Sequence, residues 1–201
     1  MQSRYDVVIL GAGINGSAIA KALAQKGKSV LVLEKNRIAA GASSHSSRLI
    51  HGGLRYLENY EFALVREALH DRQYLLESYP DLVKLRHFYL PVYENSRRPA
   101  WMIRLGLWFY GLLARNVKKA QKVPKELFLK KFNALKAEGL NAVFTYFDAK
   151  TDDYALTCRI AEEAKALGAE IVEHAEIKTL TVDEEQIAIE LEGHSVRTNL
   201  L

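Results

Sequence analysis

A glycine-rich turn near the start of the sequence has the spacing GxGxxG, over residues 11–16. An apolar run at 5–10 precedes it, and a second apolar run at 30–33 is followed directly by Glu34. Glycines at this spacing let the backbone approach a pyrophosphate at the N-terminus of a helix, where the helix dipole attracts negative charge. Glu34 can accept hydrogen bonds from both hydroxyls of a ribose, which disfavours the 2′-phosphate of NADP. The pattern therefore predicts a dinucleotide site, and it leaves NAD and FAD open.

The stretch ASSHSSRLIHGGLRYLE, at residues 42–58, offers many small hydrogen-bond donors soon after this motif. Its four serines can donate to pyrophosphate or ribitol oxygens, and the pair Gly52 and Gly53 lets the backbone lie close against a flat ring. A ring-sized platform that follows a phosphate site fits a flavin better than a nicotinamide. The alternative is a solvated serine loop that precedes a helix.

The elements around these motifs are expected to form an α/β fold. A helix at 14–27 between the two apolar runs makes a strand–helix–strand unit, which implies a parallel sheet with a right-handed crossover. An amphipathic helix is expected at about 60–79, and Pro91 restricts a strand at 87–93 to the edge or the end of a sheet. The remaining expected elements are helices at about 99–115 and 152–167, a strand at 142–147, and three or four short strands in 170–201 with a turn near Asp183 and Glu184.

The composition is that of a globular protein, with 49 % apolar and 26 % charged residues among 201. The net charge of +4 is uneven, because residues 96–131 carry +9 and the rest of the chain −5. Such a basic block indicates what the surface contacts rather than how the chain folds. Nucleic acid, anionic lipid and solvent are the alternatives for this contact. Nucleic acid is disfavoured because the block lacks a known reader module. The single Cys158 excludes an internal disulfide and no secretory pattern opens the sequence, so we expect a cytoplasmic setting.

Three segments together resemble a known family. They are SSHSSRLIHGGLRYLENYEFALVREAL, RPAWMIRLGLWFY and TDDYAL, and in this order they closely resemble the FAD-dependent glycerol-3-phosphate dehydrogenases. The resemblance implies a glutathione-reductase-like, Rossmann-type FAD-binding domain at 1–84 and 150–201, with the beginning of an inserted α+β substrate domain at 85–149. It also implies oxidation of sn-glycerol 3-phosphate to dihydroxyacetone phosphate, with hydride passing from C2 to flavin N5 and electrons passing on to a membrane quinone.

The same resemblance assigns roles to individual residues. Arg55 and Tyr56 match positions that face the substrate, although an ion pair and a packed ring at a helix start are their alternative roles. His51 is either the catalytic base or a histidine fixed by its neighbours to shape the ring pocket. Arg48 stands where many family members carry lysine. The predicted cofactor-binding residues are Gly11, Gly13, Ile14, Asn15, Gly16, Glu34, Lys35, Ser43, Ser44, Ser46, Ser47, Arg48, Leu49, His51, Gly52 and Gly53.

The segment 101–114 is apolar almost all round, yet it is too short to span a bilayer and is interrupted by Arg104. Its Trp and Tyr residues, with basic residues on both flanks, are typical of a helix at a membrane interface. Peripheral attachment to the cytoplasmic membrane would deliver electrons to quinone. The alternative is a buried helix of the substrate domain, followed by a solvated lysine loop.

Two other functions remain alternatives, a glycerol-3-phosphate oxidase that uses oxygen and a non-catalytic dinucleotide-binding module. No metal site is expected, because the histidines lack the spacing of metal ligands. The sequence leaves open the electron acceptor, the catalytic base and homo-oligomerisation. The apolar stretch 196–201 has no element to cover it, so we expect the chain to be part of a longer protein.

Overall fold

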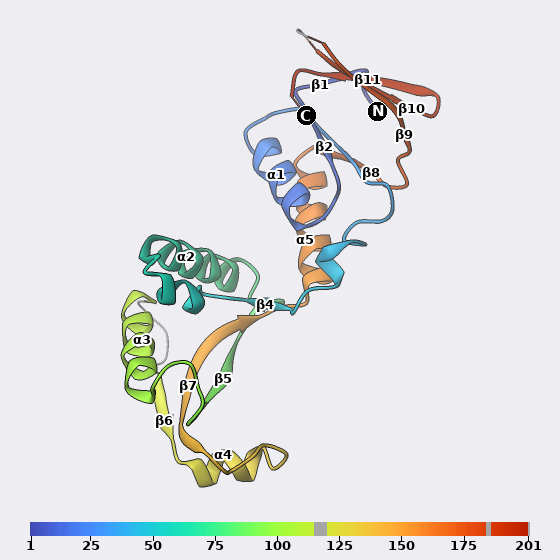
Figure 1. Cartoon of the computed structure of the whole chain (residues 1–201). Coiled ribbons are helices and arrows are strands. Elements are labelled where there is room, and N and C mark those ends of the chain that lie inside the picture. The colour runs from blue at the N-terminus through green and yellow to red at the C-terminus, as the bar shows by residue number, and fades with distance from the viewer. Residues whose placement is uncertain (115–119, 184–185, 201) are drawn as a thin grey trace. The chain divides into compact units, whose positions relative to one another are not determined.

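The structure is a computed structural model, and it describes residues 1–114, 120–183 and 186–200. The chain forms two compact units, one made of Met1–Ser47 with Asp152–Leu201 and the other of Arg48–Thr151 (Figure 1). Each unit has a hydrophobic core of its own.

The first unit contains a parallel sheet with two helices against one of its faces. The strands are β2 (Val7–Leu10), β3 (Val30–Leu33) and β8 (Glu170–Val172), in the order β2-β3-β8. Helices α1 (Ile14–Ala24) and α5 (Asp153–Ala166) pack against each other beside this sheet. Small side chains let these backbones approach closely, and the buried set is Ala12, Ala20, Ala24, Ala164 and Ala169, with Val30 and Val32.

A second sheet of the first unit has the order β1-β11-β10-β9. Its strands are β1 (Arg4–Tyr5), β9 (Ile177–Val182), β10 (Ile187–Leu191) and β11 (His194–Thr198). Strand β1 is parallel to β11, whereas β10 is antiparallel to both of its neighbours.

Strand β3 is covered on both faces. Leu31 and Leu33 are buried in one cluster with Ile189 of β10, whereas Val30 and Val32 are buried against the helices. This double covering explains why the strand is a continuous apolar run rather than an alternation of apolar and polar residues.

The second unit is built on an antiparallel sheet with β7 (Leu140–Lys150) at its centre. Strand β5 (Lys84–Tyr93) pairs along one edge of β7, and the short strands β4 (Leu49–Ile50) and β6 (Gln121–Val123) also pair with it. Pro91 lies in β5, which ends the strand order β4-β7-β5, so the predicted edge position is confirmed.

Helices cover both faces of β7. Phe144 is buried with Leu107 of α3 (Ala100–Leu113), and the adjacent Val143 is buried with Phe128 of α4 (Lys125–Lys131). Adjacent strand residues point to opposite faces, so the two helices lie on different sides of the sheet. The turn η2 (Leu54–Asn59), a 3-10 helix, leads into α2 (Phe62–Ser78), which packs against α3.

The structure confirms the predicted strand–helix–strand unit but divides its first strand. Asp6 separates β1 from β2, and its carboxylate accepts hydrogen bonds from the N–H and the hydroxyl of Ser29, at 2.8 and 2.9 Å. The residues before Asp6 therefore join the second sheet of the unit, and those after it join the parallel sheet.

Other elements differ from expectation mainly in length. Helix α5 begins after Asp152, whose side chain accepts a hydrogen bond from the N–H of Ala155 at 3.1 Å. Strand β7 is longer than the predicted 142–147, because it pairs with three strands in turn. Strand β6 and helix α4 lie in the basic block and were not predicted. The turn expected near Asp183 and Glu184 falls partly outside the described residues.

The compact units do not coincide with the predicted domains. Residues 48–84 belong to the second unit, whereas the sequence places them in the FAD-binding domain. The physical reason is that Val65 and Leu69 of α2 are buried with Tyr110 of α3. The functional division into 1–84 with 150–201, and 85–149, remains a prediction. Among the described residues, no helix is both long and apolar enough to cross a bilayer.

Candidate functional site

The glycine-rich turn connects β2 to α1 and is shaped by close backbone contacts. Gly11 has a φ of +101°, in the left-handed region that favours glycine, and its N–H donates to the Leu33 carbonyl at 2.8 Å. A Cβ atom at Gly16 would lie 2.0 Å from the carbonyl oxygen of Gly11. A side chain at position 16 would therefore push α1 away from the turn, which is the packing role that the motif assigns to its third glycine.

The N-terminus of α1 presents backbone donors beside a serine. Gly13 is the N-cap and has no side chain to cap the first turn, and the N–H of Ile14 donates to the Ser43 hydroxyl at 3.0 Å. N–H groups of a first helical turn have no partner within the helix, and they attract anions. The structure thus brings Ser43 to the helix end that is predicted to bind a pyrophosphate.

Glu34 follows β3 and lies against the same turn. Its Oε2 accepts a hydrogen bond from the N–H of Ala12 at 2.8 Å, and its Oε1 accepts one from the N–H of Asn36 at 2.8 Å. These bonds fix the carboxylate next to the glycine motif. Its role in binding a ribose remains a prediction.

The other predicted residues of the first unit lie at its surface or bond within the protein. The Ser44 hydroxyl donates to the Ala39 carbonyl, and the Ser46 hydroxyl donates to the carboxylate of Asp153. Ser44 belongs to a short 3-10 helix, η1 (Ala42–Ser44). The exposed predicted residues here are Asn15, Lys35, Ser46 and Ser47.

The Gly52-Gly53 pair belongs to the second unit, where strand β4 ends. The N–H of Gly52 donates to Oδ1 of Asp148 at 2.9 Å, and Gly53, with a φ of +77°, is the N-cap of η2. A Cβ atom at Gly52 would lie 2.0 Å from the hydroxyl oxygen of Tyr110. Packing within its own unit therefore already requires a glycine at position 52. That the pair lies against a flavin ring remains a prediction.

His51 and Arg48 flank this short strand. The His51 side chain is 59 % exposed, and its Nδ1 lies 3.5 Å from Oδ2 of Asp148. Arg48 has a φ of +59°, which is uncommon for a residue with a side chain, and its carbonyl accepts a hydrogen bond from the N–H of Thr151 at 3.0 Å. Leu49 pairs with Lys150 in the sheet.

The predicted substrate residues follow on η2. Arg55 and Tyr56 are both exposed, Tyr56 to 44 %. Helix α2 begins only at Phe62, so neither residue is packed into the start of an α-helix. The second unit thus brings His51, Arg55 and Tyr56 together on one short segment, with side chains accessible to a ligand.

Sequence reasoning missed a buried ionic network beside these residues. Nη1 of Arg72 donates to Oδ1 of Asp148 at 2.8 Å and to the Tyr110 hydroxyl at 3.0 Å, and Arg72 is 1 % exposed. Burial raises the pKa of Tyr110, which keeps its phenol neutral as an acceptor for the guanidinium. The available signal was that position 72 falls on the same helical stripe as Val65 and Leu69, where an arginine is unexpected.

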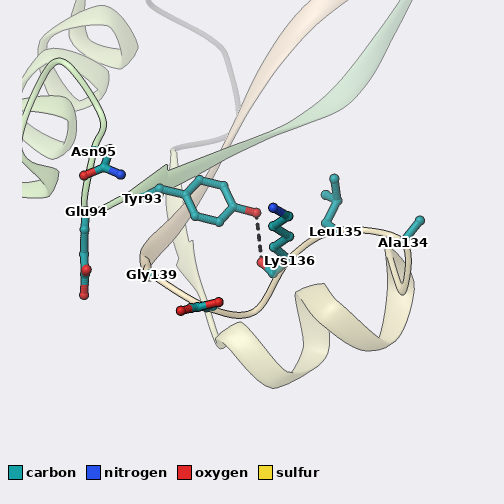
Figure 2. Close-up of a pocket in the computed structure, with 8 residues that line it drawn as sticks. Tyr93, Glu94, Asn95, Ala134, Leu135, Lys136 and Gly139 are labelled. Carbon is teal, nitrogen blue, oxygen red and sulfur yellow. Dashed lines mark hydrogen bonds between the residues drawn. The ribbon is translucent and has the colours of Figure 1, made fainter.

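A surface hollow of the second unit lies elsewhere. It has a volume of about 520 Å³ and includes Tyr93, Glu94, Lys136 and Gly139 in its lining (Figure 2). Figure 2 shows the Tyr93 hydroxyl against the carbonyl of Lys136, to which it donates at 3.0 Å. This hollow lies at the Leu140 end of β7, whereas Asp148 lies near the opposite end. None of the predicted site residues lines it. Within the described ranges, no group of three or more His, Cys, Asp or Glu could hold a metal ion.

Comparisons with known proteins extend these observations. A family model described as FAD dependent oxidoreductase matches residues 6–199. A glycerol-3-phosphate dehydrogenase of Pseudomonas tolaasii is 47 % identical over 167 residues, which are 83 % of this chain and 32 % of that protein. A D-erythritol 1-phosphate dehydrogenase of Brucella abortus is 39 % identical over 167 residues, which are 83 % of this chain and 33 % of that protein. The crystal structure of a glycerol-3-phosphate dehydrogenase from Bacillus halodurans, complexed with FAD, has a TM-score of 0.70 at 20 % identity and covers 99 % of this chain and 34 % of that one.

The matched structure confirms the predicted α/β fold over almost the whole chain, and the relatives confirm the resemblance noted in the sequence. The chain spans about a third of the length of the curated relatives that it matches. The family model also decides between the two dinucleotides that the glycine motif left open, in favour of FAD. The chain belongs to the family of FAD-dependent oxidoreductases.

Proposed function

We propose that this chain provides the FAD-binding part, and the beginning of the substrate-binding part, of an enzyme that oxidises sn-glycerol 3-phosphate to dihydroxyacetone phosphate. The observation that carries the proposal is the similarity to glycerol-3-phosphate dehydrogenases over most of this chain, including the segment that holds His51, Arg55 and Tyr56. Electrons would pass from the reduced cofactor to a quinone.

The glycine turn of the first unit fits the pyrophosphate of FAD. Gly13 has no side chain that could cap the first N–H groups of α1, and the Ser43 hydroxyl lies beside these groups. The start of the helix therefore offers N–H and hydroxyl donors to an anion. Each oxygen of Glu34 accepts one hydrogen bond within the protein, so each retains a second lone pair for a ribose hydroxyl. We therefore assign the pyrophosphate to Gly13 and Ser43 and the ribose to Glu34.

The second unit supplies the residues proposed to bind the substrate. The guanidinium of Arg55 suits a phosphate dianion through paired hydrogen bonds, and the Tyr56 phenol can orient a hydroxyl oxygen. His51 would take the proton of the C2 hydroxyl, because its ring is exposed and a neutral imidazole has a nitrogen lone pair that can accept a proton. FAD, when bound, accepts the hydride that leaves C2.

The relatives favour a second substrate of the same chemical class. One of them is named as a D-erythritol 1-phosphate dehydrogenase, and both substrates pair a phosphate ester with a polyol. Arg55 and Tyr56 would recognise the phosphate and a hydroxyl, which both molecules carry. These two residues therefore do not discriminate between the two substrates. The electron acceptor is likewise distinguished only by experiment, since an oxidase would release hydrogen peroxide during turnover.

The test is an anaerobic visible spectrum of the FAD-loaded protein, recorded before and after addition of sn-glycerol 3-phosphate. We expect the absorbance of the oxidised flavin to bleach, and glycerol, which lacks the phosphate, to leave it unchanged. Bleaching by D-erythritol 1-phosphate alone would identify this polyol phosphate, rather than sn-glycerol 3-phosphate, as the substrate. A flavin that stays oxidised with both phosphates would contradict the proposal, and a protein that does not bind FAD would contradict the cofactor assignment.

We also propose that α3 of the second unit docks on an anionic phospholipid surface. Trp101, Leu105, Trp108 and Leu112 are 65, 56, 63 and 60 % exposed, and their spacing places them on one stripe of the helix. Trp101 and Trp108 flank a shallow depression that Arg104 also lines. An apolar stripe within a block of charge +9 suits insertion among lipid headgroups, which would bring the enzyme close to quinone.

Sedimentation with phospholipid vesicles tests this surface. The protein should bind vesicles that contain phosphatidylserine more tightly than vesicles of phosphatidylcholine alone, and the double variant Trp101→Ala, Trp108→Ala should lose most of the binding. Leu127→Ala is the matched control, because Leu127 is 62 % exposed on another helix of the same unit. Equal binding by the tryptophan variant and the control would contradict the proposal.

A further inference from the structure

The carboxylate of Asp148 lies against two consecutive residues, His51 and Gly52, of the predicted active-site segment. Its Oδ1 accepts the N–H of Gly52 at 2.9 Å, and its Oδ2 lies 3.5 Å from Nδ1 of His51. Asp148 comes from β7, almost a hundred residues further along the chain, and it is 2 % exposed. One buried side chain thus contacts both the backbone and the imidazole of this segment.

Arg72 binds the same oxygen of this carboxylate that accepts the N–H of Gly52. Its Nη1 donates to Oδ1 of Asp148 at 2.8 Å, to the Phe147 carbonyl at 3.2 Å and to the Tyr110 hydroxyl at 3.0 Å. These partners come from β7 and α3, so the guanidinium is fixed from two elements. With Oδ1 bound by Arg72 and Gly52, the remaining oxygen, Oδ2, lies on the side of His51.

The buried ion pair between Arg72 and Asp148 is not expected to stabilise the fold. Both side chains are removed from water, and no described residue accepts a hydrogen bond from the Nε–H of Arg72. A buried ion pair seldom stabilises a fold more than apolar residues of similar volume, and an unpaired buried donor adds a further cost. The pair does place one oxygen of Asp148, Oδ2, next to Nδ1 of His51.

We propose that Asp148, locked by Arg72, is the positioning residue of His51. The carboxylate favours the tautomer that carries its proton on Nδ1, so the lone pair lies on Nε2 of an exposed ring. Only the catalytic consequence of this inference rests on the proposed function. In that function, Nε2 of His51 is the atom that takes the proton of the substrate hydroxyl. The tautomer itself is a property of the second unit.

Two-bond proton–nitrogen NMR correlations on the ¹⁵N-histidine-labelled protein report the tautomer directly, and His51→Ala identifies the His51 signals by their loss. We expect His51 to be mainly the Nδ1–H tautomer in the parent protein. In Asp148→Asn the population should move by severalfold toward the Nε2–H form that predominates in water. A parent protein already in the Nε2–H form, or a tautomer ratio that Asp148→Asn leaves unchanged, would overturn the proposal.

The chain offers a matched control in a second histidine–aspartate pair. Nδ1 of His70 lies 3.6 Å from Oδ1 of Asp71, but these side chains are 83 and 69 % exposed. Asp71→Asn makes the same change in charge one residue from Arg72, and it should leave the His51 signals in place. Should Asp148→Asn fail to fold, the double variant Arg72→Met, Asp148→Leu removes both buried charges at similar volume and should show the same shift of tautomer.

Kinetics of the FAD-loaded enzyme provide the second readout. Asp148→Asn should lower kcat by about ten- to hundredfold with little change in KM, since it acts on proton transfer rather than on phosphate binding. In a His51→Ala background the same substitution should have no further effect on kcat. An equal loss with and without His51 would assign Asp148 a purely structural role. A parent protein with no dehydrogenase activity would contradict the proposed function, and the NMR result would still decide the inference.

Discussion

Gly52 lies where three side chains of the second unit meet. A Cβ atom there would be 2.0 Å from the Tyr110 hydroxyl oxygen and 2.6 Å from Cδ2 of Leu69. Tyr110 is itself held by Arg72, so alanine must displace a buried network rather than one flexible group. We expect Gly52→Ala to lower the free energy of unfolding by about 1–3 kcal/mol, the usual cost of overpacking, as measured by urea denaturation.

Gly106→Ala is the control for this substitution. Apart from its chain neighbours and the nearby backbone of α3, no described atom lies within 4 Å of a Cβ at Gly106, which is in α3 of the same unit. Alanine also favours a helix over glycine by up to about 1 kcal/mol. The control should therefore be as stable as the parent protein or slightly more stable. If Gly52→Ala unfolds at the same urea concentration as Gly106→Ala, the packing argument fails.

Some site residues could be located from sequence, and others could not. The positions of Glu34 and the glycines follow from local geometry, because a short strand–helix–strand unit places its turn and the end of its second strand together. The buried pair of Arg72 and Asp148 joins segments 76 residues apart. No periodicity or spacing predicts such a contact, since it depends on how β7 and α2 pack.

At the scale of the element, Asp6 decides where β1 ends and β2 begins. Hydrogen bonds from the N–H and hydroxyl of Ser29 lower the pKa of Asp6 below its usual 3.8 in the folded protein. A carboxyl group with a lowered folded pKa contributes stability above its unfolded pKa, and this contribution is lost as the pH falls through the folded value. Asp6→Asn should therefore be less stable than the parent protein at pH 7, and the difference should shrink below about pH 4.

Urea denaturation over a series of pH values measures this difference. Ser29→Ala removes the hydroxyl donor and should abolish part of the same pH-dependent contribution. A stability difference between Asp6→Asn and the parent protein that stays constant from pH 7 to pH 3 would show that the hydrogen bonds to Ser29 do not stabilise the charged form.

Helix α5 depends on the residue that precedes it in a similar way. The Asp152 side chain accepts the N–H of Ala155, and this N-cap fixes the start of the helix that packs against α1. Asp152→Ala should lower the free energy of unfolding by about 1 kcal/mol, and Asp152→Ser should restore most of it. Equal losses in thermal stability for the alanine and serine variants would exclude a capping role.

The elements that sequence analysis missed are short and carry their charges outward. Helix α4 is seven residues long and buries Phe128, while three of its residues are lysines. Strand β6 has three residues and pairs only with the middle of β7. Elements of this length have too few apolar positions to show a period, so the surrounding sheet rather than local sequence determines them.

At the scale of the whole molecule, FAD should stabilise the fold because it binds the native chain and not the unfolded one. The glycine turn connects β2 to α1, and both belong to the core of the first unit, so occupancy of that turn should oppose unfolding of the unit. At a FAD concentration about 100 times the Kd, the free energy of unfolding should rise by about 2.7 kcal/mol, measured as an increase in Tm with FAD concentration. Gly16→Ala should lose most of this increase, since its Cβ would lie 2.0 Å from the Gly11 carbonyl oxygen, whereas Gly106→Ala should retain it. An equal increase in Tm for all three proteins would place FAD binding away from the glycine turn.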